Sequence, residues 1–310
     1  MTPEIGTDIE RALAIIVDGG LVAIPTETVY GLAADASNER AVRGIFAAKG
    51  RPAEHPLIVH IASADQLGDW AAEPSASAST LAGTCWPGPL TIIVPRAAAV
   101  LDVVTGGRDT VGLRVPAHPL TSELLARFGG GLAAPSANRF GRISPTTAAH
   151  VADDLGGGVD YILDGGPARI GLESTIVDCT TPVPQILRHG AVTDDEIAVI
   201  LDGPVEATAS GPSRAPGMLS SHYAPNARVE LFFFSDEAHW RLRELQNLGI
   251  AAALIDYGTN LAGYARGLYG DLRAADRAGI DTIVAVMPPA AGLGHAIRDR
   301  LTKAAAPRPS

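Results

Sequence analysis

Leu21-Val-Ala-Ile-Pro-Thr-Glu-Thr-Val-Tyr-Gly-Leu32 is the stretch around which the chain is organised. Its first four residues are apolar and follow a pair of glycines, which is typical of a short buried strand. Pro25 has no N–H to donate to a sheet ladder, so the strand should end there. Thr26-Glu-Thr28 would then emerge at a loop mouth, where rigid scaffolds usually present functional side chains. An ordinary polar strand end explains these residues equally well.

The composition describes a globular protein with room for two domains. The chain has 310 residues, of which 46% are apolar and 19% are charged, as in soluble globular proteins. Aromatic residues make up 5%, so the cores must rest on Ala, Val, Leu and Ile. The formal net charge of -10 argues against a free-standing basic nucleic-acid surface, while a local positive cleft stays compatible with it.

Cysteine usage and hydropathy indicate a cytoplasmic protein. The two cysteines, Cys85 and Cys179, have no CxxC or zinc-like spacing, which suits a reducing compartment and argues against a metal framework. The first residues lack the basic segment and apolar core of a signal peptide. No run approaches the ~18 apolar residues needed to span a bilayer, so we expect no membrane association.

The order of predicted elements divides the chain into two domains. Residues 1–202 contain the short strands and helices of a larger domain. Residues 229–310 alternate strand and helix, as in a small, mostly parallel α/β domain. Residues 203–228 are rich in Pro, Ser, Ala and Gly and lack periodicity, which predicts an interdomain linker. This segment also contains the motifs Pro216-Gly-Met218 and His222-Tyr-Ala-Pro225, which a simple spacer would not require. Linkers of this length are usually disordered or functional.

Cap residues predict where several helices begin. These signals are the capping-box pairs Thr7 and Glu10 and Thr193 and Glu196, the candidate N-cap Asn38, and Ser144 followed by proline at the first helical position.

Two common nucleotide-binding signatures are missing. The chain has no G-x-x-x-x-G-K-[ST], so a P-loop is excluded, and no G-x-G-x-x-G follows a predicted strand. A nucleotide would therefore have to be held by a different arrangement of side chains.

Two pairs of polar residues could provide that arrangement. Lys49 and Arg51 lie just past a predicted helix, where their side chains can converge on one anion. A solvated, basic helix end that complements the helix dipole explains a lone K-x-R more simply. Ser136 and Asn138 follow a short strand and can offer a hydroxyl and an amide, although turn chemistry alone also favours these residues there.

Other polar residues fall in or beside predicted strands. Arg114 lies inside an apolar strand, where its charge needs a protein partner or a ligand carboxylate, because burying it unpaired is costly. His60 lies in an apolar run and is more often a satisfied core histidine than a ligand. Glu173-Ser174 precedes a strand as a cap or a polar contact, and Arg188 is either a surface charge or a phosphate ligand.

Nine motifs occur in an order that resembles one known family. They are Pro25–Leu32, Lys49–Arg51, His55–His60, Trp86–Thr91, Gly112–Pro116, Pro135–Asn138, Ser144–Thr146, Glu173–Asp178 and Leu187–Gly190. Each is weak alone, but together they resemble the YrdC-like L-threonylcarbamoyladenylate synthases over nearly the whole chain. The linker motifs resemble the long, two-domain form of that family. The chain departs from the family at His189, where a proline is usual, and at Leu219-Ser-Ser221, where basic residues are common.

The resemblance implies a fold and a reaction. The fold would be α/β, with a YrdC-like α+β domain that has a twisted mixed sheet and a large cleft, followed by a small Rossmann-like parallel α/β domain. The protein would be a nucleotidyltransferase that makes threonylcarbamoyl-AMP and pyrophosphate from L-threonine, bicarbonate or CO2, and ATP. Downstream tRNA-threonylcarbamoyl transferase proteins would use the product to modify the adenosine beside the anticodon, with a weak tRNA contact here. Mg2+ is expected with ATP, without a protein ligand that the sequence identifies.

The resemblance also implies the site residues. Lys49 and Arg51 would be catalytic. Threonine would be held by Thr28, His60, Arg114, the backbone of Ala134, and Ser174. ATP would be held by Lys49, Arg51, His55, Thr110, Ser136, Asn138, Ser144, Arg188 and Tyr223. Tyr223, on the linker, would close over the nucleotide as part of a lid that excludes water.

Two alternative functions fit parts of the sequence. A relative that uses carbamoyl phosphate would share the fold, but it would need acylphosphatase or zinc-finger segments, and neither is seen in this sequence. An RNA-binding module with a positive cleft is disfavoured by the acidic net charge and the low aromatic content.

Overall fold

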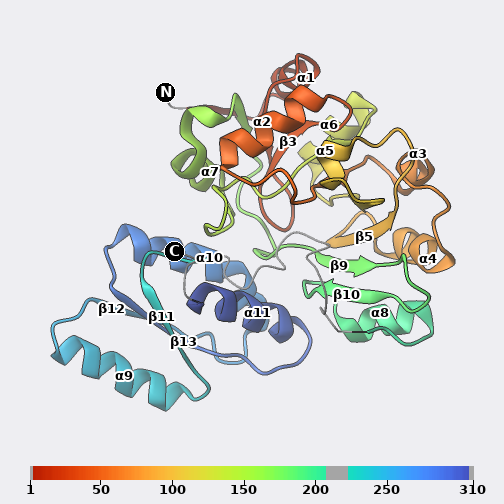
Figure 1. Ribbon diagram of the computed structural model, residues 1–310. Helices are drawn as coiled ribbons and strands as arrows, with labels where there is room; N and C mark the ends of the chain where they lie inside the picture. The colour runs from red at the N-terminus through yellow and green to blue at the C-terminus, as the bar shows by residue number, and fades with distance from the viewer. Residues whose placement is uncertain (1–2, 207–222, 307–310) are drawn as a thin grey trace.

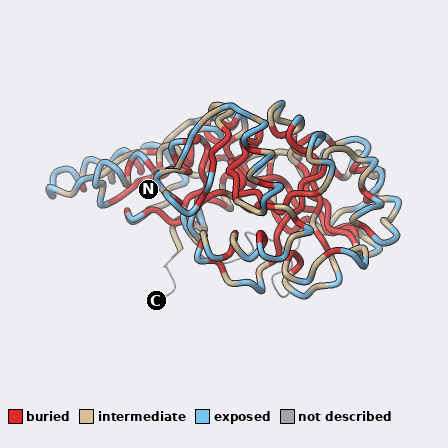
Figure 2. Tube along the Cα trace, turned by 90° about the horizontal axis from the view of Figure 1, so that it is seen from above, coloured by how far each residue is buried: buried red, intermediate tan, exposed pale blue. Residues whose placement is uncertain are grey.

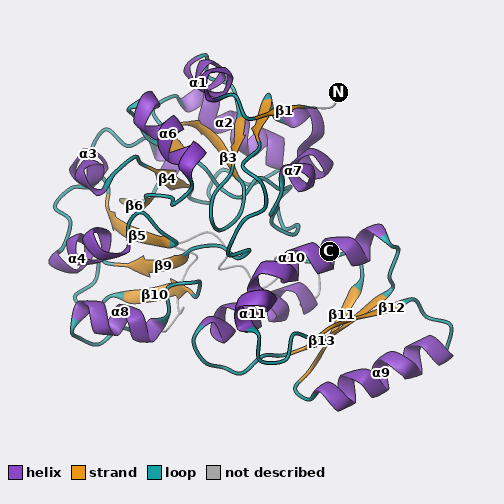
Figure 3. Ribbon diagram, turned by 180° about the vertical axis from the view of Figure 1, so that it is seen from behind, coloured by secondary structure: helices purple, strands orange, loops and turns teal. Residues whose placement is uncertain are grey.

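The computed structural model describes residues 3–206 and 223–306, which form two bodies of unequal size (Figure 1). The larger body runs from the N-terminal strand to α8, and the smaller body contains the last three strands and three helices (Figure 3). Most of the expected linker, including Pro216-Gly-Met218, Leu219-Ser-Ser221 and His222, lies outside the described residues. Within the described ranges, no helix is both long and apolar enough to cross a membrane.

A ten-stranded mixed sheet forms the centre of the larger body and confirms the predicted sheet type. Its strand order is β1-β8-β2-β3-β7-β4-β6-β5-β9-β10. The strands are β1 (Glu4–Gly6), β2 (Val22–Ile24), β3 (Gly31–Asp35), β4 (Ile58–His60), β5 (Leu90–Pro95), β6 (Thr110–Arg114), β7 (Leu132–Ala133), β8 (Tyr161–Leu163), β9 (Thr175–Asp178) and β10 (Gln185–Arg188).

Helices surround this sheet and bury its apolar side chains. Figure 2 shows the buried residues gathered inside the larger body, with exposed residues along its outline. Helix α1 packs against α6, and α4 packs against α8. The helices are α1 (Ile9–Val17), α2 (Glu39–Lys49), α3 (Leu67–Trp70), α4 (Ala76–Cys85), α5 (Asp102–Thr105), α6 (Pro119–Phe128), α7 (Ala148–Leu155) and α8 (Asp194–Leu201), with 3₁₀ turns η1 (Ala64–Gln66) and η2 (Gly156–Gly158).

The central stretch folds into an antiparallel pair of strands joined by a buried loop. Strand β2 ends before Pro25, as predicted, and Ile24 pairs with Gly31 of β3. The sequence did not predict β3, because its Gly-Leu-Ala-Ala-Asp sequence has low strand propensity and only pairing with β2 and β7 makes it a strand. A Cβ at Gly31 would lie 3.3 Å from the Cβ of Ala134, so a small residue suits this crowded position.

Of the four predicted helix starts, two are confirmed, and the two at Thr7 and Ser144 are wrong. The Asn38 side chain accepts a hydrogen bond at the start of α2, and Thr193 forms a full capping box with Glu196 at the start of α8. The capping box predicted at Thr7 is wrong. Asp8 caps α1 instead, because its carboxylate is an equally good acceptor placed one residue closer to the helix.

Ser144 does not begin a helix as predicted. Helix α7 begins at Ala148, with Thr147 as its N-cap. The hydroxyl of Ser144 instead donates to Glu173 at 2.5 Å. The Ser144 hydroxyl therefore binds a carboxylate that is distant in the sequence and does not cap a helix. Ser144 lies in a buried loop.

A parallel three-stranded sheet of order β11-β13-β12 forms the smaller body and confirms the predicted parallel α/β architecture. Alternate residues of β13 face opposite layers, since Val284 packs with α9 and Ile283 packs with α10 and α11. The elements are β11 (Arg228–Phe232), α9 (Ser235–Asn247), β12 (Ala252–Ile255), α10 (Leu261–Arg277), β13 (Thr282–Val286) and α11 (Leu293–Ala305).

The two bodies meet through buried charges. Arg273 of α10 forms an ion pair with Asp154 of α7, and Arg300 of α11 forms one with Glu173. The division into residues 1–202, 203–228 and 229–310 stays a prediction.

Gly190 gives a direct test of packing beside β9. A Cβ there would lie 2.3 Å from the backbone nitrogen of Thr175 and 2.7 Å from the carbonyl carbon of Ser174. We predict that Gly190→Ala lowers the free energy of unfolding by ~2 kcal/mol in urea denaturation, because backbone atoms cannot move aside as a flexible side chain can. The control is Gly83→Ala in α4, where the Cβ position is open; it should be neutral or stabilising by up to ~1 kcal/mol. Equal stability of the two variants would contradict this packing.

Candidate active site

One cavity in the structure brings together many of the predicted site residues. The predicted residues in its wall are Thr28, Arg51, His60, Arg114, Ala134, Ser136, Ser174, Arg188 and Tyr223. The wall is completed by Thr26, Val29, Gly31, Ile58, Pro135 and Glu173. Residues that are far apart in the sequence therefore share one hollow.

The sheet explains how these side chains meet. His60 and Arg114 are register partners on the adjacent parallel strands β4 and β6. Thr28 follows β2, Ser136 follows β7, and Ser174 directly precedes β9. The central strands thus fix the floor of the cavity, and the loops at their ends supply its polar groups.

Arg114 is paired inside the protein, with only 4% of its surface exposed. Its Nη2 lies 2.7 Å from Oε1 of Glu27 in an ion pair. Its Nη1 donates to the Thr28 hydroxyl at 2.9 Å, and its Nε donates to the Gly88 carbonyl at 3.1 Å. From the sequence, Arg114 required either a protein partner or a ligand carboxylate. The structure shows a protein partner, the carboxylate of Glu27. The guanidinium is therefore held in one orientation in the cavity wall.

Thr26 makes the loop after β2 rigid. Its hydroxyl oxygen accepts from the backbone N–H groups of Thr28 and Val29, at 3.1 and 3.2 Å, and the hydroxyl donates to the Val29 carbonyl at 2.6 Å. The Thr28 hydroxyl, which accepts from Arg114, lies 2.8 Å from that of Thr26. The loop is hydrogen-bonded to Arg114 in the cavity wall, so it is more than an ordinary polar strand end.

Arg51 and Arg188 form a positive side of the cavity. Burial, followed by the nearby charge of Arg188, lowers the pKa of Arg51 to about 10. The Nε of Arg51 is buried without a hydrogen-bond partner among the described residues. Arg188 donates to the Ser174 carbonyl at 3.0 Å and to its hydroxyl at 3.1 Å, and burial lowers the pKa of Arg188. Two buried cations that disfavour each other suit an anionic ligand, which would offset their repulsion.

Lys49 lies behind the cavity wall. Its ammonium group donates to the backbone carbonyls of Ser136 and Asn138. Burial, with a smaller contribution from Arg51, lowers the pKa of Lys49 well below its ordinary value. In this arrangement Lys49 fixes the loop that presents Ser136, and its Nζ is directed at carbonyl oxygens.

His55 and Thr110 also lie outside the main cavity wall. His55 is half-buried and packs edge-on against Phe140, with ring centroids 5.3 Å apart. Thr110 lines a separate small recess, and Ile58 belongs to the lining of both this recess and the cavity.

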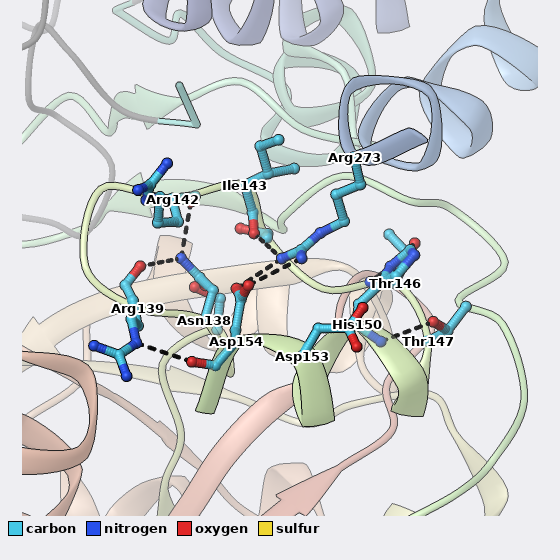
Figure 4. A network of polar contacts seen from close by, with 12 residues as sticks. Asn138, Arg139, Arg142, Ile143, Thr146, Thr147, His150, Asp153, Asp154 and Arg273 are labelled. Carbon is cyan, nitrogen blue, oxygen red and sulfur yellow. Dashed lines mark hydrogen bonds and ion pairs between the residues drawn. The ribbon is translucent and has the colours of Figure 1, made fainter. Parts of the chain in front are cut away.

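Asn138 and Ser144 shape a loop beside the cavity. The amide of Asn138 donates to the carbonyls of Arg139 and Arg142, each at 2.8 Å (Figure 4). Ser144 donates to Glu173, so both side chains contact protein groups and neither lines the cavity.

Two buried carboxylates, Glu27 and Glu173, form ion pairs that the sequence did not predict, since Glu173 was expected only as a cap or a polar contact. Glu27 pairs with Arg114, and its second oxygen accepts the backbone N–H of Ala117 at 3.0 Å. Burial alone would raise the pKa of Glu173, but Arg300, then Arg188 and the Ser144 hydrogen bond, lower it to about 2. The sequence did contain a signal for the ion pair of Glu27. An acidic side chain inside a buried stretch requires a cation, and Arg114, inside another apolar strand, was the obvious candidate.

Comparisons with known proteins identify the family to which each part of the chain is similar. Residues 14–190 match the Sua5-YciO-YrdC family, whose description is "Telomere recombination", and residues 192–306 match the "Threonylcarbamoyl-AMP synthase, C-terminal domain" family. The Threonylcarbamoyl-AMP synthase of Pyrococcus abyssi is 43% identical over 317 residues, covering 96% of this chain and 93% of the relative. That of Bacillus subtilis is 40% identical, covering 99% of this chain and 96% of the relative.

A solved structure supports both domains. The crystal structure of P. abyssi Sua5 complexed with L-threonine has a TM-score of 0.90 and 40% identity, covering 98% of this chain and 97% of that one. The fold and site therefore define a Sua5/YrdC-type nucleotidyltransferase with a second α/β domain. The chain belongs to the threonylcarbamoyl-AMP synthase family, in its two-domain form.

His60 yields a pH prediction. Burial, followed by the charge of Arg114, lowers the pKa of His60 from 6.5 to about 3. The unfolded chain binds a proton at His60 below pH 6.5 and the folded chain does not, so the contribution to stability is present above pH 6.5 and is lost as the pH falls toward 3. We expect the stability of the wild type relative to His60→Gln to fall by about 2 kcal/mol between pH 7.5 and 5, measured by urea denaturation. A constant difference would contradict a buried neutral His60.

Proposed function

We propose that this protein converts L-threonine, bicarbonate or CO2, and ATP into threonylcarbamoyl-AMP and pyrophosphate. The main support is the arrangement of cations in a single cavity, with Arg114 beside Thr28 and with Arg51 and Arg188 forming its positive side. Guanidinium groups suit both a carboxylate and a polyphosphate. The P. abyssi Sua5 structure with L-threonine, at 40% identity, supports the amino-acid half of this proposal.

Threonine would be bound by Thr28, His60, Arg114, Ser174 and the backbone of Ala134. Arg114 would attract the carboxylate of threonine, because Glu27 and Thr28 already hold its guanidinium in place. His60 is neutral and its Nδ1 is buried without a hydrogen-bond partner among the described residues. A ligand hydroxyl or amine could therefore take that hydrogen bond without adding a charge.

The proposed reaction has two steps. The amine of threonine adds to carbon dioxide with loss of a proton, or reacts with bicarbonate with loss of water, and gives a carbamate. A carbamate oxygen then bonds to the α-phosphorus of ATP while the bond to pyrophosphate breaks. This transfer needs positioning and charge stabilisation more than a strong base.

The positive side of the cavity would hold the phosphates. Arg51 and Arg188 would contact phosphate oxygens, and Ser136 would donate its hydroxyl. Lys49, which we had expected to be catalytic together with Arg51, would act through the carbonyl oxygens of the loop that carries Ser136.

The remaining predicted ATP residues would complete the nucleotide half. The recess beside Thr110 would take part of the nucleoside, and His55, Asn138 and Ser144 would shape the loops around it. Tyr223 lies in the cavity wall and would cover the nucleotide.

Magnesium is expected to arrive bound to ATP. Glu27 and Glu173 are the carboxylates nearest to the cavity, and both are engaged by arginines. No group of three or more His, Cys, Asp or Glu side chains in the described ranges could hold a metal ion. The residues present do not fit a dedicated protein site, so we propose no protein ligand for magnesium.

We further propose a cytoplasmic role in tRNA modification. Threonylcarbamoyl-AMP is a reactive mixed anhydride, so a transferase must consume it for the modification of adenosine beside the anticodon. Any contact of this protein with tRNA would be weak, in keeping with its net charge of -10. Free Cys85 and Cys179 suit a reducing compartment.

The reaction can be tested by measuring pyrophosphate release from ATP with each substrate omitted in turn. We expect release to require both threonine and bicarbonate. Release at the same rate without threonine would refute the proposed reaction.

A variant of Arg114 tests the assignment of the threonine carboxylate. Arg114→Lys keeps a positive charge beside Glu27 but loses the planar fork. We predict a threonine Kd about tenfold higher or more, as for loss of a charged hydrogen bond, with ATP binding changed less than threefold. Titration calorimetry measures both. The control is Arg43→Lys, since Arg43 is exposed and pairs with Glu39 on α2. An unchanged threonine Kd in folded Arg114→Lys would refute this placement.

A further inference from the structure

A buried polar cluster joins the smaller body to the cavity wall. Its centre is Arg300 of α11, which is 0% exposed and is among the largest fully buried side chains. Its Nε donates to Oε2 of Glu173 at 2.9 Å, and Glu173 lines the cavity. Through this charged contact the C-terminal body reaches the cavity wall.

Tyr269 of α10 strengthens the same connection. Its hydroxyl lies 2.9 and 3.1 Å from the two carboxylate oxygens of Glu173. Oε1 of Glu173 also accepts from Ser144 at 2.5 Å. Glu173 thus links two residues of the smaller body to a loop residue that we assign to the nucleotide.

The same two residues hold Tyr223. The Tyr223 ring stacks on that of Tyr269, with centroids 5.5 Å apart and planes at 26°. The guanidinium of Arg300 lies 5.4 Å from the Tyr223 ring centroid, in cation–π geometry. Tyr223 has a φ of 62°, in the left-handed region that non-glycine residues rarely adopt. Such a conformation persists only where the surroundings hold it.

Arg273 of α10 holds the Ser144 loop from a second direction. Its guanidinium pairs with both carboxylate oxygens of Asp154 on α7, at 3.1 and 2.8 Å, and also donates to the carbonyl of Ile143 (Figure 4). Ile143 directly precedes Ser144, so the loop is held on its backbone by α10 and on its side chain by Glu173.

Stability alone does not explain Arg300. Its Nη2 is buried without a hydrogen-bond partner among the described residues, and unsatisfied buried donors are costly. A buried ion pair is often no more stable than apolar residues of similar volume. A leucine or methionine would fill the space, so the charge is better explained by what it orients.

We propose that Tyr269 and Arg300 are positioning residues for the nucleotide half of the site. By holding Glu173 and Tyr223 together, they let the C-terminal body set the position of Tyr223 in the cavity wall and of the loop that carries Ser144. This inference rests on the proposed function for the identity of the nucleotide. It assigns the C-terminal body a part in ATP binding, whereas the threonine half depends on Glu27, Thr28 and β6 of the larger body.

Variants at two positions separate this role from general packing. Tyr269→Phe keeps the ring that stacks on Tyr223 and removes only the hydroxyl that contacts Glu173. Arg300→Gln removes the charge, and Arg300→Lys restores it without the planar fork. The control is Arg298→Gln, on the same helix, because Arg298 contacts the Pro288 carbonyl and the Phe233 ring away from the cavity.

Titration calorimetry with ATP and, separately, with threonine gives the decisive readout. We expect Tyr269→Phe to raise the ATP Kd about fivefold, as for one lost hydrogen bond, and Arg300→Gln to raise it about tenfold or more. Arg300→Lys should recover part of that loss. The threonine Kd should change less than twofold in every variant, and Arg298→Gln should match the wild type.

Two results would overturn the inference. One is an unchanged ATP Kd in Tyr269→Phe and Arg300→Gln. The other is a parallel rise in the ATP and threonine Kd values, which would indicate a general loosening of the protein. If the Arg300 variants fail to fold, Tyr269→Phe decides, because it is nearly isosteric. These titrations need no turnover, so failure of wild-type pyrophosphate release would count against the reaction alone.

Discussion

A buried guanidinium needs a carboxylate partner, and this constraint shapes both halves of the cavity. Glu27 satisfies it for Arg114, and Glu173 satisfies it for Arg300. Removing one member of such a pair typically costs about 3–5 kcal/mol, so each pair strongly restrains the loop that carries it. The polar groups of the site are therefore oriented before any ligand binds, which lowers the ordering cost of binding.

The structure also reconciles an acidic chain with an anion-binding function. The net charge is -10, but Arg51, Arg114 and Arg188 all line one small cavity. Positive charge is therefore concentrated in the cavity, where the low dielectric constant of the surrounding protein strengthens its electrostatic interactions. The acidic chain as a whole does not attract extended polyanions. Small phosphorylated ligands suit this distribution better than a long nucleic acid does.

The sequence predicted the elements with strong local signals and missed those defined by distant contacts. The apolar run before Pro25, the Thr193 capping box and the strand–helix alternation of the smaller body were all predicted. Strand β3 was missed because its Gly and Ala residues become a strand only by pairing. Ser144 was misassigned because a distant carboxylate takes its hydroxyl.

The site shows the same division. Motifs in register identified most of the cavity wall, including Arg51 and Ser136, but they did not predict the ion pairs of Glu27 and Glu173. Both carboxylates act through pairing with arginines, and Arg300 lies 127 residues from Glu173. No local pattern reports a contact over that separation.

The placement of Lys49 has a chemical consequence for an enzyme that makes an acyl adenylate. Free amines are the natural targets of such mixed anhydrides, and the whole chain has only two lysines, Lys49 and Lys303. Lys49 is turned onto carbonyl oxygens behind the wall, and Lys303 is bound to Asp299. Both amines are engaged by oxygen atoms of the protein, an arrangement that disfavours their attack on the electrophile.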